Sequence, residues 1–258
     1  MEADFEKHEV FNDLETYIQF YEHLSFGIMG WVTPGLDKIF NLDSYIFSSM
    51  KGTLESIRDI LLKGHINDSY ALLRKYHDSI IINIYEIIFL KDHFDIENFI
   101  VKKIDLWVKG KEKLPEFKDM MKLIGSQKEL ESINKLVNVD YRYKEIRSRC
   151  NDNMHYNMFY YILLNNGDIA VSRKKSLDSL ENDLRDIFIL HFAYLFVLNE
   201  HYMMSSDYID NLECGIEPKE GTQYYVAPFI QEIFDKVIKK YRMDIALEIK
   251  NKVCMKLE

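Results

Sequence analysis

The sequence predicts an all-α protein, a helical bundle in which residues 1–258 form a single domain. Two observations lead to this prediction. The 258 residues include only 10 glycines and 4 prolines, too few for the many tight turns of an all-β chain. Apolar residues recur three and four positions apart over long stretches, which is the spacing of one face of a helix. With 47% hydrophobic residues, the chain can bury one sizeable core.

The first half of the chain is expected to hold three long helices followed by shorter ones. Apolar spacing predicts a helix over residues 5–26, and the glycines and proline of residues 27–37 predict a connecting loop. A second helix stops at Gly64. The Asn-Asp pair at residues 67–68 is expected to cap a third helix, and residues 95–124 to form shorter helices broken near "KGKEKLPE".

The second half is expected to be helical as well. Residues 128–150 predict a helix bent near Asn138, followed by a short polar break and then "MHYNMFYYILL". The "NNG" that follows either ends this helix, which we favour, or turns a small hairpin near residues 162–172. The clearest helical face of all runs over residues 177–202, and a last helix is expected over residues 229–253.

Composition narrows the function classes. The net charge of −9 argues against nucleic-acid binding through a basic surface, so any RNA contact has to be local. Three distant cysteines, Cys150, Cys214 and Cys254, predict neither a disulfide framework nor a thiolate zinc site. The acidic N-terminus does not resemble a signal peptide, and the most apolar run is too short to cross a bilayer. We therefore expect a cytoplasmic protein without membrane contact.

An arginine followed by a histidine after four to six intervening residues occurs at three places, where chance predicts about 0.7. Arg185 and His191 lie in one predicted helix, about 240° apart, so they cannot converge, and His191 falls on the apolar stripe as a core residue. Arg58 and His65 flank Gly64, which is expected to end a helix, and a cationic side chain near the end of a helix is common. The three pairs are Arg58 with His65, Arg149 with His155, and Arg185 with His191.

The pair Arg149 and His155 differs because helix-capping Asn and Asp residues lie between its members. A break there would free both side chains from the fixed 240° separation and place His155 in the first turn of the next helix, where anions are attracted. Arg142, Arg147 and Arg149 are three of the eight arginines of the chain, and Arg142 and Arg149 share a helix face. This is the one place where a phosphate is expected to find local positive charge.

Here the chain resembles a known family. "RCNDNMH" resembles the Arg-x(4–6)-His signature of the HEPN superfamily, all-α proteins that include many metal-independent ribonucleases of toxin and antiphage systems. "NDSYALLRKYHDSIIINIYE" is similar to the A-x-L-x-R-x-x-x-[ED] helix of abortive-infection-type HEPN proteins, with Arg74 and Asp78 in its charged positions. The resemblance covers a core of about residues 45–205, without the N-terminal helix and the C-terminal helical extension. Cys150 departs from it, because the residue after the motif arginine is often polar in the family.

The resemblance implies a mechanism. Arg149 would bind the scissile phosphate, and His155 would act as general base on the ribose 2′-OH or as general acid on the leaving 5′-oxygen. Asn151 would orient the imidazole or the RNA, as would Asp152. Because the 2′-OH is the nucleophile, no metal or cofactor is needed and the substrate is RNA. A homodimer and an antitoxin or regulatory protein are the partners that the resemblance implies.

The same segments allow plainer interpretations. Residues 147–157 can be a capped helix junction with solvated arginines, and this nuclease hypothesis requires Arg149 and His155 to face one cleft, preferably at a two-fold interface. Arg74 and Asp78, four residues apart, can be an ordinary helix ion pair that supports the site or lies outside it. The carboxylates of "SLENDLRD" are expected to form a solvated face and not a metal site. The competing functional class is a non-catalytic helical module that binds a nucleotide or a protein.

Overall fold

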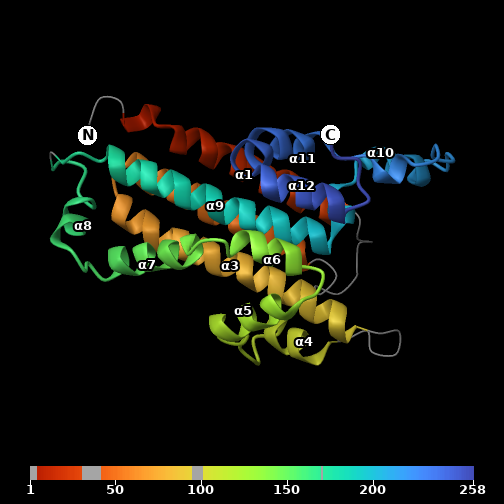
Figure 1. The fold of residues 1–258 in the computed structure, drawn as a ribbon, viewed down its shortest axis with the longest axis horizontal. Coiled ribbons are helices and arrows are strands. Elements are labelled where there is room, and N and C mark those ends of the chain that lie inside the picture. Colours follow the sequence, from red (N-terminus) through yellow and green to blue (C-terminus); the bar gives the residue numbers. More distant parts are fainter. Residues whose placement is uncertain (1–4, 31–41, 95–100, 170) are drawn as a thin grey trace.

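The structure is a computed structural model that describes residues 5–30, 42–94, 101–169 and 171–258. Within these ranges the regular elements are helices and there is no strand, so the all-α prediction is confirmed (Figure 1). The hairpin considered for residues 162–172 is wrong for the described part of that segment, which holds a short helix and turns. No described helix combines the length and the apolar character needed to cross a membrane.

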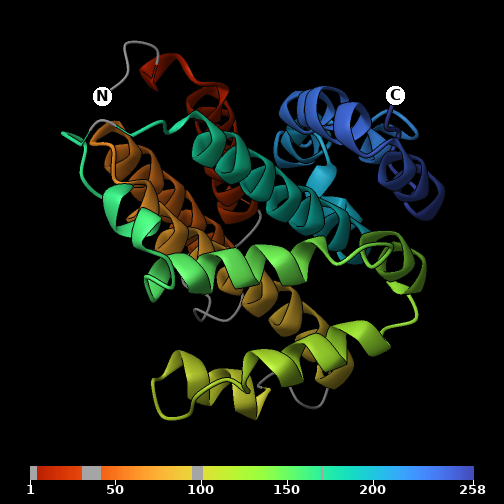
Figure 2. The same ribbon diagram turned by 60° about the vertical axis from the view of Figure 1, so that its left-hand side comes forward.

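Four long helices form the centre of the molecule. They contact one another in the pairs α1–α2, α2–α3, α3–α9 and α1–α9, and they run along the long axis (Figures 1 and 2). One continuous cluster of buried apolar side chains extends from Phe5 to Leu257 and includes residues of each long helix. The four are α1 (Glu9–Gly30), α2 (Leu42–Leu62), α3 (Ile66–His93) and α9 (Lys174–Leu198).

Shorter helices cover this centre. Of these, α7 and α5 contact α3, and α12 contacts α9 (Figure 1). The α-helices are α4 (Lys102–Val108), α5 (Phe117–Ser126), α6 (Glu131–Val137), α7 (Arg142–Met154), α8 (Phe159–Leu163), α10 (Ser206–Glu213), α11 (Pro228–Ile233) and α12 (Met243–Lys252). A π-helical segment, η5 (Phe234–Lys239), and the 3₁₀ turns η1 (Phe5–Lys7), η3 (Glu200–Met203) and η4 (Thr222–Tyr224) complete the fold.

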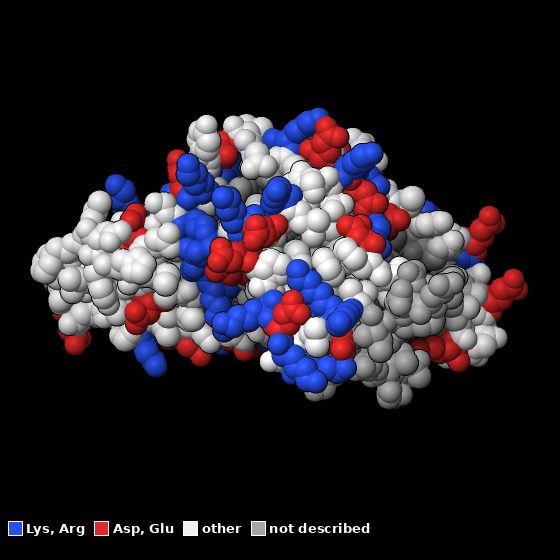
Figure 3. Space-filling model, turned by 90° about the horizontal axis from the view of Figure 1, so that it is seen from below, with Lys and Arg blue, Asp and Glu red and all other residues white. Residues whose placement is uncertain are grey.

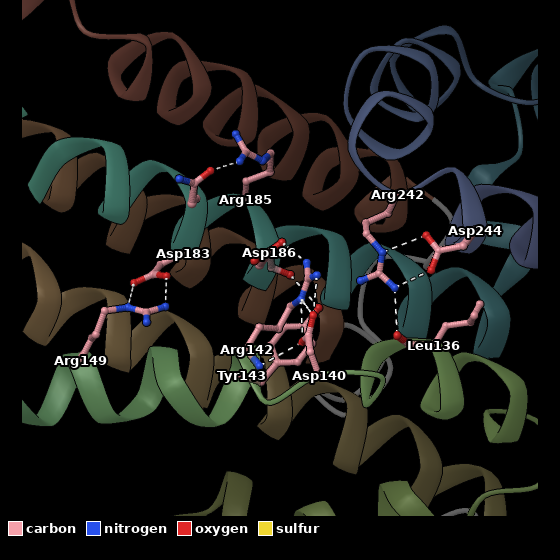
Figure 4. Close-up of polar contacts among 11 residues, drawn as sticks. Leu136, Asp140, Arg142, Tyr143, Arg149, Asp183, Arg185, Asp186, Arg242 and Asp244 are labelled. Atoms are coloured by element: carbon pink, nitrogen blue, oxygen red, sulfur yellow. Dashed lines mark hydrogen bonds and ion pairs between the residues drawn. The ribbon is translucent and has the colours of Figure 1, made fainter. Parts of the chain in front are cut away.

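The helix ends differ from the predictions at several places. Gly64 follows α2 with φ of 81°, so the stop predicted there is confirmed. The predicted cap is wrong, because Asn67 lies inside α3 and is buried against α7. The bend expected near Asn138 is a break between two helices, and the last predicted helix is interrupted at Arg242, whose side chain binds the Leu136 carbonyl (Figure 4). Of the loop expected at residues 27–37, α1 takes the part up to Gly30, and the rest lies outside the described residues.

A chain of buried hydrogen bonds joins the four long helices. His191, predicted to be a core residue, is 1% exposed and uses both ring nitrogens. Its Nε2–H donates to the Asn83 Oδ1 atom at 2.8 Å, so its Nδ1 accepts from the Tyr21 hydroxyl at 2.7 Å. Burial lowers the pKa of His191 to about 3, which keeps the ring neutral. In order, the chain is Tyr76, Tyr21, His191, Asn83, Asp43 and Tyr202.

Candidate functional site

The helix break predicted between Arg149 and His155 is absent. Helix α7 continues to Met154, and His155 is the residue that ends it, not the start of the next helix. The polar residues of this stretch find partners without breaking the helix. Asn153 donates to the Arg149 carbonyl at 2.9 Å, and its own carbonyl accepts from Asn67 of α3 at 2.7 Å. Six residues of helix therefore place Arg149 and His155 about 240° apart, on different faces.

Arg149 is held by a buried carboxylate (Figure 4). Its Nε and Nη2 atoms bind the two oxygens of Asp183, on α9, at 2.9 and 2.5 Å. Asp183 is 2% exposed, and burial raises its pKa while the hydrogen bonds from Arg149 oppose that rise. A guanidinium has five N–H donors, and Asp183 accepts from two of them. The contact thus fixes the orientation of Arg149 and leaves three N–H donors without a hydrogen bond to Asp183, although Nη1 also lies 3.8 Å from the Glu145 carboxylate.

Arg142 makes a second link between α7 and α9 (Figure 4). It binds Asp186 at 2.9 Å and Asp140 at 2.8 Å, and its hydrogen bonds lower the pKa of Asp140 to about 2. The predicted common face of Arg142 and Arg149 is therefore right, and this face packs against the acidic side of α9. Part of the local positive charge expected from the sequence is neutralised there.

The remaining site candidates of α7 meet α3 instead. Arg147 binds Asp78 at 2.6 Å and covers the ring of Phe117 at 3.4 Å from its centroid. Asp78 also contacts Arg74 at 3.3 Å, as the four-residue spacing predicted. Arg74 in turn donates to the Oδ1 atom of Asn151 at 2.5 Å. The structure thus brings Asn151 to Arg74 and not to His155.

Asp152 and His155 lie at the end of α7. The Asp152 Oδ1 atom accepts from the Asn157 side chain at 2.7 Å. The His155 side chain is exposed and forms no hydrogen bond or ion pair with another described residue. Exposed apolar side chains surround it in sequence, and this end of the molecule, at the left in Figure 3, is largely free of charge. They form the apolar end segment: Met154, Tyr156, Met158, Phe159, Tyr160 and Ile162.

Arg149 lines two hollows, and His155 lines neither. The first lies between α7 and α9, has a volume of about 450 Å³ and holds more carboxylates than guanidinium groups. The second lies at the start of α9 and has a volume of about 340 Å³. The charged residues of the first are Arg142, Arg149, Arg185, Asp140, Glu145, Asp183 and Asp186. Within one chain, therefore, neither hollow joins Arg149 to His155.

Asp183 and Asp186 are the contact residues that sequence reasoning missed. Both belong to "SLENDLRD", for which a solvated face was predicted, and Asp183 is buried instead. The sequence does contain a sign of this burial. Asp183 follows Leu180 by three residues and precedes Ile187 by four, so it lies on the apolar stripe of α9. A carboxylate on such a stripe requires a buried partner.

The first turns of α9 also approach a histidine. Asp178 and Glu181 lie near His8, and ligand atoms of the three residues fall within 4.8 Å of one another. Both nitrogens of His8 are already used, because Nδ1 accepts from the Val10 N–H at 3.2 Å and Nε2–H donates to Asp178 at 2.9 Å. The cluster is explained without a metal, as a cap on the start of α1.

Comparison of the chain with protein-family models, with curated proteins and with solved structures gives no match. The resemblance to the HEPN superfamily accordingly remains a prediction from the two motifs.

Proposed function

We propose that the protein is a metal-independent endoribonuclease whose active site is completed by a second copy of the chain. The observation that carries this proposal is the position of His155. Its imidazole is exposed and has no partner among the described residues, and it belongs to the stretch of the apolar end segment. Two residues of that segment, Met158 and Tyr160, line the hollow that contains Arg149. Exposed apolar patches commonly mark protein–protein interfaces. A two-fold contact through this segment would bring His155 of one copy toward Arg149 of the other.

The chemistry assigned to each residue is the one that the resemblance implies. Arg149, fixed by Asp183, presents to the scissile phosphate the N–H donors that Asp183 does not bind, and stabilises the charge that develops on this phosphate. His155 moves the proton, from the ribose 2′-OH or to the leaving 5′-oxygen. The 2′-oxygen forms the new bond to phosphorus while the bond to the 5′-oxygen breaks, which leaves a 2′,3′-cyclic phosphate.

The other site candidates have supporting places in this proposal. Arg147 and Arg74 share Asp78, and Arg74 binds Asn151, so this cluster fixes α7 to α3 and orients the helix that carries Arg149. A bacterial toxin or antiphage effector is the biological role that fits the family resemblance. An antitoxin or regulatory protein would then keep the nuclease silent.

The experiment is RNA cleavage by purified protein in EDTA. Wild type is compared with His155→Ala and Arg149→Lys, and with His93→Ala as a control at another exposed histidine. We expect cleavage with cyclic phosphate ends in wild type and control, and its loss in both site variants. The two inactive variants are then mixed in the unfolded state and refolded together. If the site is shared between copies, mixed dimers contain one intact site and about a quarter of the activity returns, by random pairing.

A return of no activity from the mixture would overturn the shared site. Equal activity in all variants would identify a contaminant and remove the nuclease proposal. In a further test, expression of wild type but not of His155→Ala should slow bacterial growth if the protein is a toxin.

A second candidate function is a non-catalytic module that binds a nucleotide or a protein. The observation that favours it is the geometry within one chain, where Arg149 is paired with Asp183 and turned about 120° the short way around α7 from His155. RNA binding that depends on Arg149, without cleavage and without any effect of His155→Ala, would favour this candidate.

A further inference from the structure

We infer that the hollow at the start of α9 binds a phosphomonoester, the terminal phosphate of a nucleotide or of an RNA end. The inference goes beyond the proposed function, because a terminal phosphate in this hollow would be a second ligand near Arg149, distinct from the scissile phosphodiester. The volume of about 340 Å³ lies within the range of small-molecule sites. The lining residues are Tyr70, Arg149, Asn153, Met158, Tyr160, Tyr161, Leu164, Lys175, Ser176 and Ser179.

The charge of the lining distinguishes this hollow from its neighbour. Arg149 and Lys175 line it, and no carboxylate does. The Lys175 ammonium forms no ion pair with a described residue. Arg149 keeps N–H donors beyond those bound to Asp183, and its Nη1 lies 3.8 Å from Glu145. In the hollow between α7 and α9, by contrast, carboxylates outnumber the arginines. Of the two hollows that Arg149 lines, only the one at the start of α9 therefore suits an anion.

The start of α9 adds positive charge in the same direction. This 25-residue helix begins with Lys174 and Lys175 after Arg173 as its N-cap, and its first turn has no acidic residue. Helix starts normally favour acidic side chains, because the unpaired N–H groups there carry partial positive charge. The nearest acids of α9 already have cationic or histidine partners: Asp178 and Glu181 lie beside His8, and Asp183 binds Arg149. An anion bound at this turn would relieve an otherwise unfavourable arrangement.

A buried tyrosine of the lining points to the same ligand. Tyr70 is 3% exposed, and its hydroxyl forms no hydrogen bond with a described residue. It interacts electrostatically with Arg149 and Tyr161, which line the hollow with it. Buried donors without partners are rare, and a phosphate would accept from the Tyr70 hydroxyl.

The ligand class follows from the number and kind of donors. Arg149, Lys175, the Tyr70 hydroxyl and the Ser176 hydroxyl come from three helices and surround one small space. A terminal phosphate carries about two negative charges and three acceptor oxygens, which suits the Lys175 ammonium, the Arg149 donors that Asp183 does not bind, and two hydroxyls. A phosphodiester has one charge and two free oxygens and would leave part of this set unused. We therefore expect the hollow to prefer phosphomonoesters over diesters.

The test is binding of defined probes to the full-length protein. Titration calorimetry compares AMP with adenosine, and fluorescence anisotropy compares a short RNA carrying a 5′-phosphate, a 3′-phosphate or no terminal phosphate. We expect a terminal phosphate to tighten binding about tenfold or more, as charge-assisted hydrogen bonds do. Tight binding of AMP would identify a free nucleotide as the ligand, and binding of phosphorylated RNA alone would identify an RNA end.

Variants assign the effect to the hollow. Lys175→Glu should weaken binding of the phosphorylated probe about tenfold or more, and Tyr70→Phe, which removes only the hydroxyl, about twofold to tenfold. Lys250→Glu, at an exposed lysine of α12, is the matched control and should bind as wild type does. The inference is overturned if the terminal phosphate makes no difference, if neither probe binds, or if Lys175→Glu binds like the control.

The nuclease proposal and this inference fail separately. His155→Ala should lose cleavage and keep phosphate binding, because His155 does not line the hollow. Absence of cleavage in every assay, with phosphate binding intact, would remove the nuclease and leave the phosphate site standing.

Discussion

At the scale of single residues, Arg149 is tied to stability as well as to the proposed chemistry. Arg149→Ala would leave the buried Asp183 carboxylate without its cation. We expect the free energy of unfolding to fall by about 1–3 kcal/mol, less than for a fully buried pair because Arg149 is partly solvated. Urea unfolding measures this change. Arg58→Ala, at an exposed ion pair with Glu15, should stay within about 0.5 kcal/mol of wild type.

A double-mutant cycle checks the cause. Adding Asp183→Asn to Arg149→Ala removes the unpaired buried charge. The loss of unfolding free energy in the double variant should therefore be smaller than the sum of the losses in the two single variants. Simple additivity would contradict the ion pair as the source of the loss. Because stability and activity change together at Arg149, cleavage should be compared between variants shown to be folded.

His191 makes the stability depend on pH. Its pKa is about 3 in the folded protein, whereas an unfolded chain titrates histidine near 6.5. Below pH 6.5 the unfolded state binds a proton at this histidine, whereas the folded state binds it only near pH 3. The stability that the neutral His191 contributes is therefore lost as the pH falls from 6.5 toward 3. Between pH 7 and pH 5 we expect a loss of about 2 kcal/mol.

The comparison uses His191→Gln, which keeps a hydrogen-bonding group and removes the titration. The unfolding free energy of each protein is measured with urea at pH 7 and at pH 5. The decrease between these pH values should be about 2 kcal/mol smaller in His191→Gln than in wild type. Other buried acids titrate in the same range in both proteins and cancel in the difference. An identical pH dependence would show that His191 is protonated in the folded state.

At the scale of elements, the end of α7 is strained at Tyr156. This residue has φ of 49°, in the left-handed region that residues other than glycine rarely adopt. Tyr156→Gly should raise the free energy of unfolding by about 0.5–1 kcal/mol, the relief of strain less the backbone entropy of glycine. Denaturant unfolding at low protein concentration measures this gain. Met158→Gly, at a nearby residue of extended backbone, should lower stability instead.

The long helices could be predicted from the sequence because each carries its own apolar period. For α1, α2, α3 and α9, that period reports the buried face directly. The end of α7 could not be predicted this way. Asn and Asp residues at 151–153 favour caps locally, but Asn153 meets Asn67, 86 residues earlier, and the helix continues. Local preference was overridden by a contact that no local pattern encodes.

The candidate site could be predicted to the same extent. Spacing placed Arg142 and Arg149 on one face of α7 and paired Arg74 with Asp78, because both inferences concern a single helix. The pairing of Arg149 with Asp183 depends on how α7 packs on α9, which spacing within either helix does not determine. The orientation of His155 depended in turn on the wrongly placed break.

At the scale of the whole molecule, the apolar end segment predicts self-association. Phe159 is 72% exposed there, among other apolar side chains. We expect wild type to form a dimer at micromolar concentration and Phe159→Asp to be a monomer, as measured by light scattering coupled to size-exclusion chromatography. Phe26→Asp is the matched control, since Phe26 is 65% exposed on α1, and it should dimerise as wild type does. A monomeric wild type would contradict the shared active site as well.

The chain of hydrogen bonds through the core has a consequence for folding accuracy. Apolar helices tolerate many alternative packings, because a leucine or phenylalanine side chain finds acceptable neighbours in most of them. The Tyr21, His191 and Asn83 side chains tolerate fewer packings, since each finds its partner only when the helices have this order and this axial register. Sliding α9 by one turn, about 5.4 Å, would strand these polar atoms at about 1–3 kcal/mol apiece. The polar interior thus rejects mispacked bundles that the apolar side chains alone would accept.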